Sequence, residues 1–100
     1  MKTAYLEVTF RRGRAIAAYY YLPRRPGQHS VRTRCVEAGL LVDYARGGRP
    51  IGVEITTPCN LSVAAFNRVL RELSFPPVKR DEMVPLIALE RIRCRNPRQG

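Results

Sequence analysis

The chain has 100 residues, 45% of them hydrophobic, and its 18 basic against 8 acidic side chains give a formal net charge of +10. The length allows one modest core, and the composition excludes a disordered chain. No apolar run approaches the roughly 20 residues that span a bilayer, and the N-terminus has no signal-peptide core, so we predict a cytoplasmic protein without a membrane partner.

Residues that could carry chemistry are few and scattered. Three cysteines, Cys35, Cys59 and Cys94, are widely spaced, which fits a reducing compartment better than a disulfide framework or a zinc site. The single histidine, His29, has no clustered acid, serine or cysteine, and no Gly-rich phosphate loop follows a strand. We therefore expect no catalytic residue, no metal ligand, no cofactor and no enzymatic activity.

The basic residues are nearly all arginines, with lysine only at Lys2 and Lys79. Arginine makes bidentate contacts with phosphate and stacks on bases, so such a surface would suit nucleic acid. A chain rich in Arg, Ala, Gly and Pro is also what codon bias in a GC-rich genome produces, and the arginines are spread along the chain. Charge alone does not decide between these two interpretations.

Residues 3–22 predict a first β-hairpin whose turn lies at 11–14. A two-residue loop, Arg12-Gly13, would place Phe10 opposite Ala15. We prefer a three-residue loop, because it aligns Leu6, Val8 and Phe10 with the apolar side of 16–22. Its tyrosine triplet, 19–21, has two interpretations: aromatic side chains that stack nucleobases, or Tyr20 packed inside with Tyr19 and Tyr21 on the opposite face.

Two prolines and a glycine make 23–30 an exposed loop, and 31–36 predicts a third strand. A second hairpin follows over 40–55, with Gly47-Gly48 as its two-residue loop. That loop would pair Tyr44 with Ile51, Val42 with Val53 and Leu40 with Ile55 on one apolar face. Because Pro50 has no N–H, its strand is either a sheet edge or has a second neighbour that starts later.

An amphipathic helix is expected after the sheet. Pro58 suits a first helical position, Thr57 or Asn60 could cap it, and apolar residues recur at helical spacing from Leu61 to Leu73. A second, shorter helix is predicted over 81–89, and the residues 86–94 could alternatively form a strand. We place one domain at 1–90 and a basic, frayed tail at 91–100.

The core of the second hairpin, 41–44 (LVDY) and 48–55 (GRPIGVEI), closely resembles that of the small prokaryotic domain-of-unknown-function family 2283. In that family a first hairpin with an acidic turn precedes the core and a short helix follows, whereas this chain has arginines at 11, 12 and 14. The resemblance implies a small α+β domain of antiparallel strands with a helix. It implies no established activity and no catalytic residues.

We therefore predict an α+β fold: an antiparallel sheet of four to five strands, made of two hairpins and one strand, covered on one face by the amphipathic helix. The function we favour is self-association, as a dimer, or association with a small protein partner. The alternative is a nucleic-acid-binding or toxin–antitoxin-type regulatory protein. Its candidate nucleic-acid contacts are Arg11, Arg12, Arg14, Tyr19, Tyr21, Arg24, Arg25, Arg32 and Arg34.

Overall fold

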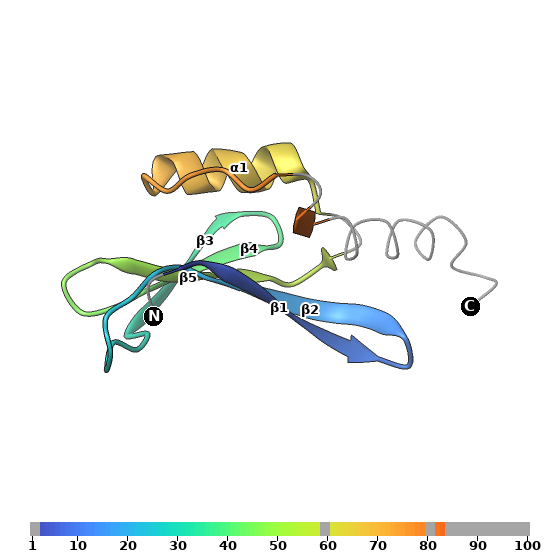
Figure 1. Cartoon of the computed structure of the whole chain (residues 1–100), viewed down its shortest axis with the longest axis horizontal. Coiled ribbons are helices and arrows are strands. Elements are labelled where there is room, and N and C mark those ends of the chain that lie inside the picture. The colour runs from blue at the N-terminus through green and yellow to red at the C-terminus, as the bar shows by residue number, and fades with distance from the viewer. Residues whose placement is uncertain (1–2, 59–60, 80–81, 84–100) are drawn as a thin grey trace.

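The computed structural model describes residues 3–58, 61–79 and 82–83. They form a five-stranded antiparallel sheet and one helix (Figure 1), which confirms the predicted α+β class. The strands are β1 (Tyr5–Arg11), β2 (Arg14–Tyr21), β3 (Arg32–Glu37), β4 (Leu40–Tyr44) and β5 (Pro50–Ile55), and the helix is α1 (Val63–Glu72). Within these described ranges no helix is long and apolar enough to cross a membrane.

The strand order is β1-β2-β5-β4-β3, so the Pro50 strand lies at the centre of the sheet. β2 pairs with β5 only from Gly52 to Ile55, two residues past Pro50. The missing N–H of Pro50 therefore removes no bond to β2, and of the two alternatives the later-starting neighbour is correct. The edge interpretation of this strand is wrong, because the edges of the described sheet are β1 and β3.

The β4–β5 hairpin has the predicted register except at its turn. Val42 lies opposite Val53 and Leu40 opposite Ile55, as predicted, but Tyr44 lies opposite Pro50. The backbone N–H of Ala45 donates to the Arg49 carbonyl at 2.8 Å, which leaves three residues in the loop. The predicted two-residue loop is therefore wrong. The longer turn shifts the pairing by one residue, so that Ile51 has no partner on β4.

The β1–β2 hairpin combines both registers considered for it. At the turn, Phe10 lies opposite Ala15 around Arg12 and Gly13, whose φ angles are 52° and 76°, so the preferred three-residue loop is wrong. Beyond an irregularity after Thr9, Leu6 lies opposite Tyr20, as in the preferred alignment. The irregularity is a β-bulge that leaves Ile16 without a partner, and the Ile16 and Phe10 side chains are 47% and 51% exposed.

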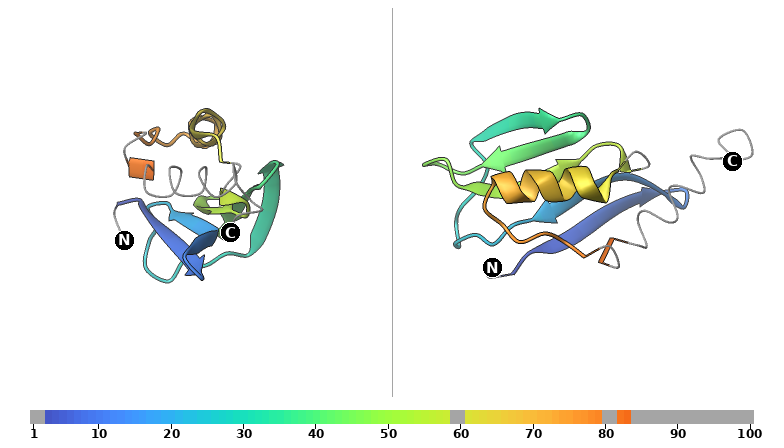
Figure 2. Two further views of the ribbon diagram at one scale, coloured as in Figure 1. Left: turned by 90° about the vertical axis from the view of Figure 1, so that its right-hand side faces the viewer. Right: turned by 90° about the horizontal axis from the view of Figure 1, so that it is seen from above.

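The core lies between the sheet and α1, which Figures 1 and 2 show on one side of the sheet. The Tyr20 ring meets the Phe66 ring edge-on, with 5.3 Å between the centroids. Fully buried side chains of this core come from the central strands, the residue after β2, the helix and the segment beyond it: Leu22, Val42, Val53, Ile55, Phe66, Leu70 and Met83. The middle strands and one helix face therefore supply most of the buried apolar surface.

Both ends of α1 have specific caps. The Ser62 hydroxyl accepts a bond from the Ala65 N–H, so Ser62 is the N-cap in place of the predicted Thr57; Asn60, the other candidate, lies outside the described residues. At the other end Ser74 adopts φ 66° and the Phe75 N–H donates to the Leu70 carbonyl, a Schellman motif. These caps satisfy backbone groups that a helix end leaves unpaired.

Several predictions concern residues outside the described part. The short helix expected over 81–89, its strand alternative and the tail at 91–100 lie there, apart from Glu82 and Met83. Met83 is buried in the core. Cys59 and Cys94 also lie outside the described residues, while Cys35 is exposed on β3.

Candidate functional site

The sheet face opposite α1 carries a row of aromatic rings, which we call the tyrosine face (Tyr5, Tyr19 and Tyr21 with Glu7 and Asp43). Side chains alternate along a strand, so Tyr19 and Tyr21 lie on the side away from Tyr20 and the core. The Tyr5 and Tyr21 rings stack with 4.5 Å between centroids, and Tyr19 follows at 4.6 Å from Tyr21. The three rings therefore pack on one another in a ladder across β1 and β2.

The hydroxyl groups of Tyr19 and Tyr21 have partners within the chain. Tyr19 donates to Asp43 Oδ2 at 2.6 Å, Thr33 donates to the other oxygen of Asp43, and Tyr21 donates to Glu7 at 3.1 Å. The Tyr19 side chain crosses over β5 to reach Asp43. Their hydrogen bond therefore joins β2 to β4, which are not adjacent in the sheet. Burial, followed by the bond to Asp43, raises the pKa of Tyr19 well above its ordinary value.

Gly52 leaves room for the Tyr19 side chain to pass over β5. A Cβ built on Gly52 would come within 2.1 Å of the Tyr19 hydroxyl and 2.3 Å of its Cε1. Only a residue without a side chain leaves room for the ring there. The glycine at this place in β5 is therefore a packing requirement of the tyrosine face and not a feature of a ligand site.

Arg24 extends this network. Its Nη2 donates to the Ile51 carbonyl at 2.8 Å, and its guanidinium carbon lies 5.4 Å from the centroid of the Tyr21 ring. Its Nε is buried without a hydrogen-bond partner among the described residues. Through Nη2 this arginine binds the segment after β2 to the central strand.

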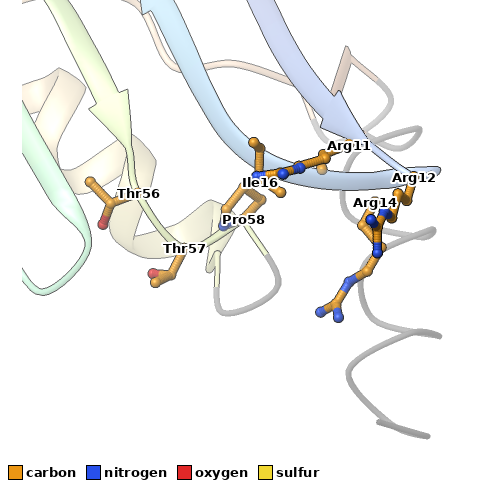
Figure 3. A pocket seen from close by; sticks show the side chains of 8 residues that line it. Arg11, Arg12, Arg14, Ile16, Thr56, Thr57 and Pro58 are labelled. Carbon is orange, nitrogen blue, oxygen red and sulfur yellow. The ribbon is translucent and has the colours of Figure 1, made fainter. Parts of the chain in front are cut away.

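A second group of candidates surrounds a hollow at the β1–β2 turn (Figure 3). The hollow has a volume of about 460 Å³, and we call it the arginine hollow. Arg11 reaches toward Ile16 and Pro58, while Arg12 and Arg14 extend from the hairpin tip. The described residues that line the hollow are Arg11, Arg12, Arg14, Ala15, Ile16, Thr56, Thr57 and Pro58.

The remaining candidates lie elsewhere. Arg32 and Arg34 are exposed on the edge strand β3, where the Arg32 guanidinium lies 5.0 Å from the centroid of the Tyr44 ring. Arg25 is exposed in the 23–30 loop. The nine candidate nucleic-acid contacts therefore divide among the arginine hollow, the tyrosine face and the β3 edge with its loop, and the fold does not gather them on one surface. Their role in binding nucleic acid stays a prediction.

The β1 edge is a feature that the sequence reasoning missed. β1 pairs with β2 alone among the described strands. Tyr5 at its start is 46% exposed and Phe10 near its end is 51% exposed. The sequence contains one indication of it, because the apolar residues Leu6, Val8 and Phe10 are arranged symmetrically about Val8. This symmetry favours pairing with a second copy only if the strand lies at a sheet edge.

Comparisons with known proteins add no identity. No family model matches the chain, and neither a curated protein nor a solved structure matches it. Within the described part of the chain no three His, Cys, Asp or Glu side chains gather as a metal site would require. The interpretation therefore depends on the tyrosine face, the arginine hollow and the β1 edge.

Proposed function

We propose that this chain is a small non-enzymatic association module that forms a homodimer by pairing the β1 strands of two copies. In this proposal α1 covers one face of the sheet, and the tyrosine face is held rigid by its own hydrogen bonds. The observation that supports it is an edge strand, Tyr5–Arg11, that pairs only with β2 among the described strands and whose side-chain sequence complements itself. An added strand at a sheet edge gains main-chain hydrogen bonds, and its alternate side chains set the specificity.

The complementarity appears when two β1 strands are placed antiparallel about Val8. Leu6 then lies opposite Phe10 of the second copy, and Val8 lies opposite Val8. The half-exposed Phe10 gains an apolar neighbour that the monomer does not give it. The two-fold axis, which most homodimers have, makes the Leu6–Phe10 contact occur twice and places the single Val8–Val8 contact on the axis.

The opposite face of the paired strands is also compatible. Tyr5 would lie opposite Arg11 of the second copy, where a guanidinium over an aromatic ring is favourable. Glu7 would lie opposite Thr9, whose hydroxyl can donate to a carboxylate. No like charges lie directly opposite one another in this register.

The other edge of the sheet is less suitable. β3 carries Arg32 and Arg34, both exposed, and antiparallel pairing of two such strands about Thr33 or Arg34 would bring arginines together. Charged residues on an edge strand are a common means by which proteins prevent edge-to-edge association. The two edges therefore have opposite character, and we place the interface on β1.

Light scattering over a micromolar concentration series tests the proposal. We expect a concentration-dependent dimer for the wild-type chain and a monomer for Phe10→Glu, because the new carboxylate would face Leu6 of the second copy. Val31→Glu is the matched control, since Val31 is 55% exposed and lies outside β1. A wild-type chain that is monomeric throughout, or equal loss of dimer in both variants, would refute it.

A further inference from the structure

We infer that the arginine hollow binds phosphate groups in the backbone of a single-stranded nucleic acid. This inference is independent of the dimer, because it concerns the hairpin tip and not the pairing of β1. It starts from arginines that the fold brings together at one place. Three guanidinium groups, those of Arg11, Arg12 and Arg14, border the hollow.

These guanidinium groups differ from others in the molecule. Arg68 pairs with Glu37 at 2.6 Å, Arg24 donates to a backbone carbonyl, and Arg32 lies over an aromatic ring. Arg11 and Arg14, by contrast, have no ion pair or side-chain hydrogen bond in the described part of the chain. Their donors remain available to an external anion.

The rest of the lining matches phosphate chemistry. Thr56 and Thr57 border the hollow opposite the hairpin tip, and no acidic side chain occurs among its described lining residues. Guanidinium forks bind phosphate oxygens bidentately. The tyrosine face lacks this character, since it carries Glu7 and Asp43, which accept the hydrogen bonds of Tyr21 and Tyr19.

The size and lining of the hollow favour a segment of a nucleic-acid strand over a free phosphate ion. A volume of about 460 Å³ exceeds what one phosphate fills and suits a nucleotide-sized segment. Apolar atoms of Ile16, which is 47% exposed, and Pro58 border the same space, so a sugar or base can lie against them. The contacts are with the backbone, so we expect little dependence on base sequence.

The test compares two pairs of arginines in the two hairpin turns. Binding of a labelled single-stranded RNA of about 12 nucleotides is measured by fluorescence anisotropy at two salt concentrations. Arg12→Asn with Arg14→Gln removes two charges at the hollow, and Arg46→Gln with Arg49→Gln removes two charges at the β4–β5 turn. Circular dichroism checks that each variant is folded.

We expect the hollow variant to bind about tenfold or more weakly, with the slope of log K against log salt reduced by about 1–2, and the control to change less than about twofold. Equal losses in both variants would show that overall charge alone attracts the RNA, and no wild-type binding at low salt would also overturn the inference. Competitors identify the recognised group at matched ionic strength. Displacement by polyglutamate or by inorganic phosphate as effective as that by unlabelled RNA would contradict recognition of a phosphodiester strand.

Discussion

The two hairpins of this domain differ in what they leave exposed. The β4–β5 hairpin lies in the middle of the sheet, and Val42, Val53 and Ile55 are almost completely buried. The β1–β2 hairpin forms an edge and a projecting tip, with Phe10 and Ile16 about half exposed. Residues of similar hydrophobicity thus have different roles according to the place of their strand in the sheet.

This difference separates folding from interaction. Apolar side chains of the central hairpin contribute to the core in every copy of the molecule, while those of the outer hairpin remain available to a second chain. The arginines follow the same division, since three of them gather at the outer tip and border the arginine hollow. We therefore assign stability mainly to the central hairpin and interaction mainly to the outer one.

A matched pair of isoleucines gives the largest expected contrast. Ile55→Ala removes a side chain that is 1% exposed, and we expect it to lower the free energy of unfolding by about 2–5 kcal/mol. Ile16→Ala alters the outer hairpin, where we expect a change within about 1 kcal/mol. Urea unfolding monitored by circular dichroism measures both, and equal effects would remove the distinction between the hairpins.

Gly52→Ala tests how tightly the tyrosine face depends on the central strand. The new Cβ would displace the Tyr19 ring, so we expect a loss of about 2–3 kcal/mol from overpacking and the disrupted hydrogen bond. Combining it with Tyr19→Ala removes the clash. The double variant should therefore be more stable than the sum of the single effects predicts, and strict additivity would contradict the crossing of Tyr19 over Gly52.

Tyr19→Phe removes the hydroxyl group that reaches Asp43, and we expect it to cost about 1–2 kcal/mol. The pKa values of Tyr19, Tyr20 and Tyr21 are raised in the folded chain, for Tyr19 mainly by burial. Tyrosines ionise first in the unfolded chain, near the ordinary value of 10.0. Their stabilising effect is therefore complete below that pH and is lost progressively above it.

This pH dependence can be measured by unfolding the wild-type chain and Tyr19→Phe between about pH 9 and 11. We expect the stability of the wild-type chain to fall more steeply with rising pH than that of the variant. Parallel curves would mean that Tyr19 titrates as it does in the unfolded chain. Tyr5→Phe is a suitable control, because Tyr5 lies on the same face and makes no hydroxyl bond to Asp43.

Arg12→Asn has the smallest expected effect, and it has the opposite sign. Arg12 adopts a φ of 52° in a turn that favours Asn or Gly at this position. We expect the substitution to raise the free energy of unfolding by about 0.5–1 kcal/mol. A variant that is more stable yet binds RNA less well would separate the structural and binding roles of this arginine, whereas destabilisation would contradict the turn geometry.

The sequence allowed prediction of the fold class, both hairpins and the main helix because these depend on local periodicity. Leu40, Val42, Val53 and Ile55 alternate in a way that only one register of β4 and β5 can bury. The errors fall at turns and edges. Whether β5 is an edge or a central strand depends on where its pairing with β2 begins, which the sequence does not show. The identity of the N-cap depends on which of several polar residues begins the helix.

The interaction surfaces were harder to foresee for a related reason. The arginine triplet in the first turn was visible, but its position beside Thr56 and Thr57 depends on how two distant segments meet. The hydrogen bonds of Tyr19 and Tyr21 were equally hidden, because Asp43 reaches Tyr19 across a glycine of an intervening strand. From the sequence, arginines and tyrosines could be grouped only by residue type. The fold divides them among the arginine hollow, the tyrosine face and the β3 edge with its loop.

Disulfide trapping tests the proposed β1 pairing most directly. In a chain whose three native cysteines are replaced by serine, Val8→Cys places one thiol of each copy at the two-fold axis. We predict that mild oxidation converts this variant to a covalent dimer, and that Arg32→Cys on the β3 edge stays monomeric. Trapping through β3, or through neither edge, would contradict the account.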